Sequence, residues 1–372
     1  MNVLLLNPYH TGSHAHWAEG IARHVPRNSD ISIQVETLPG RHWKWRLHGA
    51  SGTFAHRMHA YDGMPDCLLT TDMLDVAALR GLLPASWRAI PIVQYFHENQ
   101  LTFPWSQRDR EKQHGHNRSY GFMNIQSAVA ADAVWFNSSF HQRAFLSAID
   151  AFIAELPDET EAFQAQGIAA KSKVVPLGIE ETDAPTPRTS AMEGEAPVIL
   201  WNHRWEYDKG PEGFYDALCT LHRAGESFQL ILCGEQFREH PQVFNRLLTQ
   251  FKSNIIHAGF AATREAYGQL LQQSTFIIHA PLQEYFGLSV AEAMAQGVIP
   301  LLQRGQAYES WIPSEYMFES EADMLVKWRT LKHQIAHHRM AAHAIASNYF
   351  WPEVSQVIAT ALKDIGGLAS SR

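Results

Sequence analysis

Cysteine is scarce in this sequence, and its arrangement excludes two common ways of stabilising a small fold. The chain has three cysteines, Cys67, Cys219 and Cys233, which is an odd number, and it has no Cys-x-x-Cys pair. This pattern excludes a disulfide scaffold and a zinc ribbon, and it fits a reducing compartment. We therefore expect a cytoplasmic protein.

Long hydrophobic runs are also missing. The longest runs, such as Val3-Leu4-Leu5-Leu6, fall far short of the about 20 apolar residues that a membrane-spanning helix needs. The first residues form a strand-like run without a basic segment or a small-residue cleavage site, so we expect no secretory signal. A membrane span is not expected either.

Metal-binding patterns are incomplete. The chain has no Asp-x-Asp tripeptide, which argues against a diphosphate held by a chelated metal ion. Histidines lie close together in sequence at three places, but no carboxylate or cysteine set is evident that would complete a metal site with them. These histidines are His14 and His16, His114 and His116, and His337 and His338. We expect neither a metal ion nor a bound cofactor.

The chain does contain ample material for packed cores. It has 372 residues, of which 45% are hydrophobic and 18% are charged, and this argues against disorder and predicts two or three domains. The net charge is −8, but most of the acidity lies in residues 151–196, and residues 1–150 are close to neutral. The overall charge therefore does not exclude a local surface for a polyanion.

Short apolar runs alternate with amphipathic stretches in two series, which predicts two parallel sheets with helices on both faces. The strand candidates of the first series are 2–7, 31–38, 67–71, 90–96, 133–136 and 173–177. Those of the second series are 198–201, 228–233, 254–258, 275–279 and 298–302. A stretch rich in Pro, Thr, Ser, Glu and Ala, without periodicity, separates the two series.

This alternation predicts an α/β protein with two Rossmann-like, doubly wound domains. We assign residues 1–181 to an N-terminal domain, 182–197 to a linker and 198–350 to a C-terminal domain. Residues 351–372 are predicted to form a C-terminal helix, with the N-terminal domain as a candidate surface for it to pack against. Two such domains would face a central cleft, where the carboxyl ends of their strands point.

The sharpest chemical signal is a pair of glutamates eight positions apart, Glu284 and Glu292, in a segment that leads from the predicted strand 275–279 into a helix. The backbone N–H groups of Phe286, Gly287 and Leu288 would stand at the helix N-terminus, where an anion is favoured. Because carboxylates accept hydrogen bonds from sugar hydroxyls, the pattern suits a nucleotide sugar. The alternative is an amphipathic helix on which Glu292 is simply solvated.

Two cations follow the first strand of the second series. The segment Trp201-Asn202-His203-Arg204-Trp205-Glu206-Tyr207-Asp208-Lys209-Gly210-Pro211 offers Arg204 as a planar fork and Lys209 as a point charge, both suited to a diphosphate. Pro211 fits the first position of the next helix. The alternative is two surface cations, one of them paired with Glu206 or Asp208.

Arg204, Lys209, Glu284 and Glu292, in this order and spacing across residues 198–303, resemble the donor site of retaining GT-B glycosyltransferases of family 4. The resemblance implies a nucleotide-diphosphate sugar as donor, with the two cations and the helix amides in place of a metal ion. It places Arg204, Lys209, Tyr285, Phe286, Gly287, Leu288 and Glu292 against the donor. Glu284, Arg204 and Lys209 are also expected to act in catalysis.

Further segments resemble the tRNA-queuosine α-mannosyltransferase family. They read Tyr9-His10-Thr11-Gly12-Ser13-His14, Leu38-Pro39-Gly40-Arg41-His42-Trp43-Lys44-Trp45-Arg46, Tyr95-Phe96-His97-Glu98-Asn99-Gln100-Leu101, Phe136-Asn137-Ser138 and Asn202-His203-Arg204-Trp205-Glu206. The resemblance implies transfer of mannose from GDP-mannose to the queuosine of tRNA(Asp), with retention. It also implies that His97 contacts the donor sugar in the catalytic site, and Gly12 and Ser13 are expected to let the backbone approach the donor closely.

The acceptor side is expected in the N-terminal domain. Residues 37–61 contain no Asp or Glu, and their cations interleave with tryptophans, which suits an unstacked RNA loop. The predicted RNA-binding residues here are Arg41, Trp43, Lys44, Trp45 and Arg46, and Glu98, Asn99 and Gln100 are predicted to bind the acceptor. The alternative is an amphipathic helix that uses its tryptophans as core.

Two other functions stay open at this point. One is a family-4 glycosyltransferase with a lipid or small-glycoside acceptor, although residues 14–27 carry few cations for a membrane surface. The other is a non-catalytic RNA-binding protein with a GT-B fold. The presence of both cations and both glutamates speaks against a protein that only binds RNA.

Overall fold

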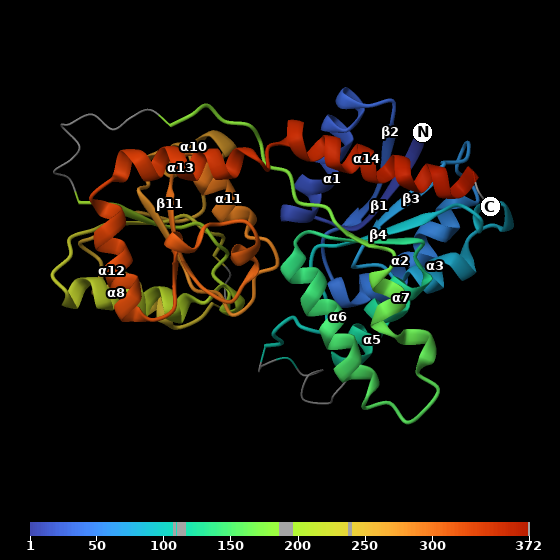
Figure 1. Ribbon diagram of the computed structural model, residues 1–372, viewed down its shortest axis with the longest axis horizontal. Coiled ribbons are helices and arrows are strands. Elements are labelled where there is room, and N and C mark those ends of the chain that lie inside the picture. Colours follow the sequence, from blue (N-terminus) through green and yellow to red (C-terminus); the bar gives the residue numbers. More distant parts are fainter. Residues whose placement is uncertain (107–108, 110–116, 186–195, 237–239, 371–372) are drawn as a thin grey trace. The chain divides into compact units, whose positions relative to one another are not determined.

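The computed structural model describes residues 1–106, 109, 117–185, 196–236 and 240–370 (Figure 1). The chain divides into two compact units, residues Met1–Gly178 with Trp351–Arg372, and residues Ile179–Phe350. The C-terminal segment thus groups with the first unit, and the first boundary falls at Gly178 rather than at 181. Residues 186–195 of the predicted linker lie outside the described residues, while Thr182 Oγ1 donates to the backbone oxygen of Ala295 at 2.7 Å.

The first unit is built on a six-stranded parallel sheet in the order β2-β1-β3-β4-β5-β6. Its strands are β1 (Asn2–His10), β2 (Ser32–Pro39), β3 (Cys67–Thr71), β4 (Ile92–Phe96), β5 (Ala133–Phe136) and β6 (Ser172–Val174). Every residue of β3, β4 and β5 is buried, as expected for strands covered on both faces. The last strand, β6, is shorter than the predicted strand 173–177 and begins one residue earlier.

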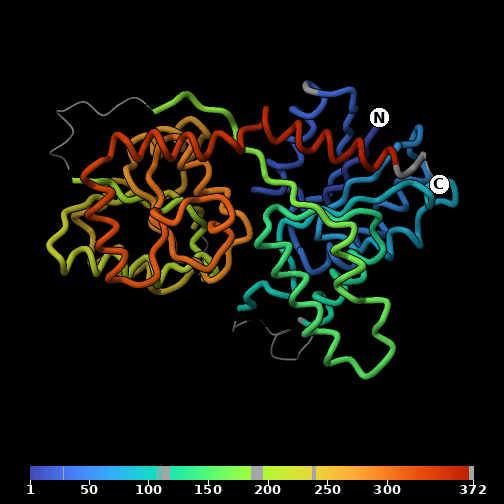
Figure 2. The backbone as a smooth tube through the Cα atoms, in the orientation of Figure 1, coloured from blue at the N-terminus to red at the C-terminus, as the bar shows by residue number. Residues whose placement is uncertain are grey.

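The helices of the first unit lie around this sheet (Figure 1). They are α1 (Gly12–His24), α2 (Trp43–Met58), α3 (Val76–Leu82), α5 (Asn117–Ala130), α6 (Ser139–Ile153), α7 (Ala165–Ala169) and α14 (Trp351–Ser370). Figure 2 follows the red C-terminal segment back to the blue N-terminal segment of the same unit. Trp351 is fully buried and stacks on His24, and a Cβ added at Gly20 would lie 2.0 Å from its ring. Gly20 therefore makes room for α14.

The second unit repeats the architecture, with a parallel sheet in the order β12-β11-β10-β7-β8-β9. Its strands are β7 (Val198–Trp201), β8 (Gln229–Leu232), β9 (Ile255–Ala258), β10 (Phe276–His279), β11 (Ile299–Gln303) and β12 (Met317–Phe318). Its helices are α8 (Pro211–Arg223), α9 (Val243–Gln250), α10 (Arg264–Gln273), α11 (Leu288–Ala295), α12 (Glu321–Lys332) and α13 (Ile335–Ser347). The sequence pattern missed β12, which has only two residues.

In each sheet the first strand lies inside the sheet, with later strands on both sides. β1 lies between β2 and β3, and β7 lies between β8 and β10. Loops that leave the carboxyl ends of such neighbouring strands diverge to opposite faces, and open parallel sheets bind ligands at that point. The predicted site residues follow β1, β2 and β4 in the first unit and β7 and β10 in the second. None of the helices among the described residues is long and apolar enough to cross a lipid bilayer.

Candidate active site

The loops after β7 and β10 bring Lys209 and Glu284 together in the second unit. Lys209 Nζ lies 3.2 Å from Glu284 Oε2 and 3.5 Å from Asp208 Oδ2. The two loops touch through their backbones, because a Cβ added at Gly210 would lie 1.9 Å from the backbone oxygen of Ala280. Gly210 also has a φ of 66°, which favours glycine. The ion pair therefore depends on a close approach that only glycine permits.

The electrostatics keep both partners of this pair charged. Burial by itself lowers the pKa of Lys209, but the attraction of Glu284 and Asp208 outweighs burial and leaves that pKa above its ordinary value. Burial raises the pKa of Glu284, and the attraction of Lys209 outweighs it, so that this pKa is lowered. The result is an ammonium held in a fixed position by carboxylates at the carboxyl ends of β7 and β10.

The carboxylate of Glu284 also bonds to backbone amides at the N-terminus of α11. The backbone N–H of Gly287 donates to Glu284 Oε1 at 3.1 Å, and the backbone N–H of Phe286 also bonds to this carboxylate. The sequence placed these amides against a phosphate, whereas in the structure at least two of them are bonded to Glu284. Gly287 has a φ of 96°, and a Cβ there would lie 2.4 Å from the ring of Tyr308. Tyr285 and Phe286 are buried, and Leu288 is the first residue of the helix.

Glu292 is held by hydrogen bonds rather than left in solvent. Arg264 donates to Glu292 Oε1 at 2.6 Å, and the Tyr267 hydroxyl donates to Oε2 at 3.1 Å. The Asn202 amide donates in turn to Tyr267 and to the backbone oxygen of Ser289. Only 13% of the Glu292 side chain is exposed. The alternative of a solvated helix face is therefore wrong, and the loop after β7 is linked to the second glutamate.

Arg204 lies at the more exposed end of the same loop. Its guanidinium is 2.9 Å from Glu206 Oε2, and half of its side chain is exposed. The pKa of Glu206 is raised because burial outweighs the attraction of Arg204. Both predicted phosphate-binding cations are thus paired with carboxylates, whereas the alternative of two surface cations expected a pair for only one of them.

Sequence reasoning missed two histidines beside this group. The rings of His203 and His279 stack with centroids 3.7 Å apart, and His203 Nδ1 lies 2.7 Å from Ser289 Oγ. His279 Nδ1 is hydrogen-bonded to the Tyr308 hydroxyl. Burial lowers the pKa of both rings, so they are neutral next to Lys209. The available signal was their position in the sequence: His279 ends an apolar strand, and His203 lies two residues after another.

In the first unit, Gly12 and Ser13 begin α1 at the end of β1. Gly12 has a φ of 51°, and a Cβ there would meet no heavy atom within 4 Å, so conformation rather than crowding requires glycine. Both residues are exposed. The Thr11 side chain that precedes them forms no capping hydrogen bond. The structure therefore leaves room beside the α1 N-terminus, as the prediction for Gly12 and Ser13 needs.

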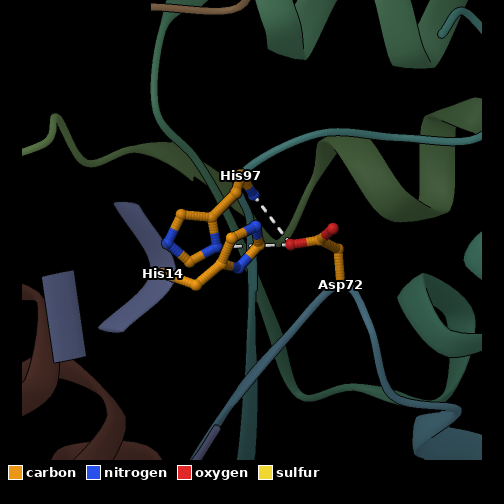
Figure 3. Close-up of side chains that lie close together, drawn as sticks. All are labelled: His14, Asp72 and His97. Carbon is orange, nitrogen blue, oxygen red and sulfur yellow. Dashed lines mark hydrogen bonds and ion pairs between the residues drawn. The ribbon is translucent and has the colours of Figure 1, made fainter. Parts of the chain in front are cut away.

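His97 lies directly after β4, in a buried group with His14 and Asp72 (Figure 3). The backbone N–H of His97 donates to Asp72 Oδ1 at 3.0 Å, and His97 Nδ1 is 3.3 Å from the same oxygen. The His14 and His97 rings are tilted against each other, with centroids 4.3 Å apart. Burial lowers the pKa of His97 to about 3 and raises that of Asp72 to about 6, the latter partly offset by the attraction of His14.

Within the described residues, the same group is where three potential metal ligands come together, their ligand atoms lying within 4.8 Å of one another. The sequence found no carboxylate that would join His14, and Asp72 is that carboxylate. The ligand set nevertheless fits a metal poorly. The two imidazole rings pack against each other at an interplanar angle of 41°, and Asp72 Oδ1 is already bonded to the His97 amide.

The three polar residues after His97 mainly hold their own loop. Asn99 is fully buried, and its Oδ1 accepts from the backbone N–H groups of Leu101 and Thr102. Gln100 Nε2 donates to Glu98 Oε1 at 3.1 Å. Glu98 is half-buried and Gln100 is 7% exposed. Of the three predicted acceptor contacts, Glu98 is thus the best placed for a ligand.

The basic and aromatic segment at α2 has two distinct faces. Trp43 packs against Trp105 and Tyr120, with ring centroids 5.6 and 5.5 Å apart. Trp45 is 62% exposed. Trp43 thus fits the alternative in which the tryptophans belong to the core. Of these two tryptophans, Trp45 is the one exposed enough to stack on a base.

The predicted cations of this segment differ in their surroundings. Lys44 Nζ lies 2.9 Å from Asp109 Oδ2. Arg46 donates to the backbone oxygen of Pro39, and Arg41 is exposed. Arg41 is therefore the cation of this segment that faces solvent most directly, and Arg46 is partly exposed.

Comparisons with known proteins agree with this architecture. Residues 2–179 match the family model for the N-terminal part of tRNA-queuosine α-mannosyltransferase, and residues 185–314 match that of the group 1 glycosyl transferases. The tRNA-queuosine α-mannosyltransferase of Drosophila melanogaster is 29% identical over 331 residues, covering 86% of this chain and 84% of the relative.

Solved structures show the fold. Anabaena HepE in complex with UDP and glucose superposes with a TM-score of 0.67 at 17% identity, covering 98% of this chain and 100% of that one. Sucrose-phosphate synthase from Thermosynechococcus elongatus superposes with a TM-score of 0.70 at 12% identity, covering 99% and 100%. Together with the two Rossmann-like units, the matches define a GT-B glycosyltransferase of group 1. Within that class, the chain is similar to the tRNA-queuosine α-mannosyltransferases, through the match of residues 2–179 and through the Drosophila relative.

Proposed function

We propose that this enzyme transfers mannose from GDP-mannose to the queuosine nucleoside of tRNA(Asp), with retention of configuration, and that it works in the cytoplasm. The observation that carries the proposal is the Lys209–Glu284 pair at the N-terminus of α11, in a chain whose residues 2–179 match the family model for the N-terminal part of tRNA-queuosine α-mannosyltransferase. The pair supports an activated sugar as substrate, and the match supports the RNA acceptor. The name of the Drosophila relative supports mannose as the sugar.

On the donor side, Lys209 would act on the departing diphosphate. Its ammonium is buried and fixed by two carboxylates, so its charge is in position before the reaction begins. Arg204, which is more exposed, would add a planar fork to the phosphates and strengthen binding of donor and product. We propose that these cations and the α11 N-terminus serve in place of a metal ion, as the family resemblance implies.

The two glutamates would take separate parts of the donor. Glu284 uses one oxygen on Lys209 and the other on an amide, and a carboxylate offers about four acceptor positions. It can therefore still accept from a sugar hydroxyl. Glu292 would accept from the ribose hydroxyls in the same way. In the first unit, Gly12, Ser13 and His97 would contact the donor, and none of these side chains needs to form a covalent intermediate.

On the acceptor side, the exposed ring of Trp45 would stack on an unpaired base, with Arg41 and Arg46 on neighbouring phosphates. Lys44 and Trp43 would support this surface from behind, through their contacts with Asp109 and Trp105. Glu98, Asn99 and Gln100 would line the approach to the reacting hydroxyl. These roles follow the sequence prediction, weighted by what each side chain exposes.

The test is transfer with defined substrates. Purified enzyme is incubated with GDP-mannose, GDP-glucose or UDP-glucose, and with tRNA(Asp) that carries or lacks queuosine, and the nucleosides are then analysed by mass spectrometry. We expect hexosylated queuosine only with GDP-mannose and only on queuosine-containing tRNA. Transfer to a lipid or a small glycoside, or release of no nucleotide with any donor, would contradict the proposal. Glu284→Ala should lower turnover, and Arg204→Ala should weaken GDP binding.

A further inference from the structure

Asp72 and His97 meet because their strands are neighbours. Asp72 directly follows β3 and His97 directly follows β4, and these strands pair in parallel with Thr71 beside Tyr95. The carboxyl ends of neighbouring parallel strands lie at the same edge of a sheet, so the two side chains come together there. Both are buried, with 2% of the Asp72 side chain and 7% of the His97 side chain exposed.

The contacts define which nitrogen of His97 carries the proton. Asp72 Oδ1 accepts from the His97 backbone N–H and also faces His97 Nδ1. An oxygen that already accepts a hydrogen bond is an acceptor toward the ring as well, so Nδ1 must be the N–H nitrogen. Nε2 is then an unprotonated acceptor. It is buried and has no hydrogen-bond partner among the described residues, and in Figure 3 it points away from Asp72.

Further contacts hold His97 on its other sides. The ring lies against His14 and meets Trp17 edge-on, with centroids 4.3 and 4.6 Å away. Its backbone oxygen accepts from Asn137 Nδ2 at 2.9 Å. The Asp72 carboxylate also accepts the backbone N–H of Glu98. The residue is thus held at its amide, its carbonyl and one ring nitrogen, while the other nitrogen is left for a ligand.

We propose that Asp72 is a positioning residue, which holds His97 in the Nδ1–H tautomer so that Nε2 accepts a hydrogen bond from a hydroxyl of the donor sugar. This rests on the proposed function for the identity of the ligand. A buried acceptor without a partner is costly, and a polyhydroxylated ligand offers the O–H donor that satisfies it. Asp72 itself does not touch the substrate.

The tautomer is tested without any substrate. Long-range proton–nitrogen NMR spectra of histidine-labelled enzyme, with His97 assigned by comparison with His97→Gln, report which ring nitrogen carries the proton. We expect the proton on Nδ1 in the wild type and in Asp72→Asn, since asparagine keeps an acceptor oxygen, and a mixture of tautomers in Asp72→Ala. A proton on Nε2 in the wild type would overturn the inference, whatever the substrate is.

The positioning role is tested by a double-mutant cycle on mannose transfer. Asp72→Ala should lower kcat about 10- to 100-fold, by analogy with the loss of a carboxylate that orients a metal-bound histidine, with little change in the KM for tRNA. Asp72→Asn should recover most of that loss. In the His97→Gln background, Asp72→Ala should cost nothing more, because Asp72 acts through His97. Asp62→Asn, at an exposed aspartate, is the matched control.

The outcomes separate the two proposals. An unchanged kcat in Asp72→Ala, or full additivity in the cycle, overturns the positioning role even if mannose is transferred as proposed. If the wild type transfers no sugar to queuosine tRNA but its His97 carries the proton on Nδ1, the proposed function fails and the tautomer assignment stands. Unfolding of Asp72→Ala would be recognised by circular dichroism, and Asp72→Asn in both backgrounds would then replace it in the cycle.

Discussion

Removal of Lys209 should expose how strongly the site depends on one buried cation. In Lys209→Met the aliphatic stem is kept and the charge is lost. Glu284 and Asp208 then lose the cation with which both form ion pairs. At the 3.2 Å separation from Glu284, an effective dielectric constant of about 20 gives roughly 5 kcal/mol of attraction. Removing one partner of a buried pair typically destabilises by about 3–5 kcal/mol. Glu284 keeps its amide hydrogen bonds, so we expect about 3 kcal/mol near pH 8.

The dependence of this loss on pH follows from the pKa of Glu284. In the wild type the pKa is lowered by Lys209, which outweighs burial. Without Lys209, burial dominates and raises that pKa above the unfolded value, so the folded variant binds the proton more tightly than the unfolded chain. The variant therefore regains stability as the pH falls toward the unfolded pKa, and its deficit relative to the wild type should be smaller at pH 5.5 than at pH 8.

The assay is urea unfolding at both pH values, followed by tryptophan fluorescence. Lys209→Met is compared with Glu284→Gln and with the double variant, and Lys252→Met, at an exposed lysine, is the control. Glu284→Gln should cost less than Lys209→Met because Lys209 keeps Asp208, and the double variant should recover much of the loss. A neutral Lys209→Met at pH 8, or additive losses in the double variant, would refute the ion pair as the source of the stability.

Three further predictions address other parts of the chain. Burial raises the pKa of Glu226, but hydrogen bonds from neighbouring cations and an indole outweigh it and lower the pKa to about 2. Glu226→Gln should thus cost about 1–2 kcal/mol at neutral pH, and the difference from the wild type should vanish as urea unfolding is repeated down through about pH 2. Gly287→Ala, strained at φ 96° and crowded by Tyr308, should weaken GDP binding at least about 10-fold in calorimetry. Trp45→Ala should weaken tRNA binding about 5- to 100-fold in a filter-binding assay without loss of stability, whereas Trp43→Ala should mainly lower the melting temperature.

Much of the fold could be predicted from the sequence because its strands are continuous apolar runs. The strand 67–71 and the strand 133–136 begin and end at the predicted residues, and their burial on both faces explains why. The strand 317–318 could not be predicted, because two residues are too few to show a hydrophobic pattern. The predicted strand 173–177 is too long, since Val175 and Leu177 lie beyond the last residue of β6 but are buried like strand residues, and the Val175 N–H still donates to Phe136 of β5.

The candidate site could be predicted only as far as strand ends can be located. Loops after β7 and β10 had to converge, and so Lys209 and Glu284 were expected near one another. That Glu284 would also bond to the Gly287 amide could not be foreseen, because it depends on the path of a short loop. Asp72 was missed although it occupies the same kind of position as His97, directly after a fully buried strand. The signal that could have found Asp72 is a polar residue directly after a fully buried strand.

The charges of the second unit indicate how the site would hold a diphosphate. Arg204 and Lys209 are each bonded to carboxylates, so the loops carry no excess of positive charge that would attract a ligand from a distance. The carboxylates hold the ammonium and the guanidinium in place. In the proposed reaction neither cation would then need to be reoriented when charge develops on a leaving oxygen. The same logic applies to Asp72 and His97 in the first unit. In both places a carboxylate holds a nitrogen-containing side chain in position. In the proposed reaction, the enzyme would then bind the transition state more tightly than the ground state through the placement of hydrogen-bond donors and acceptors rather than through net charge.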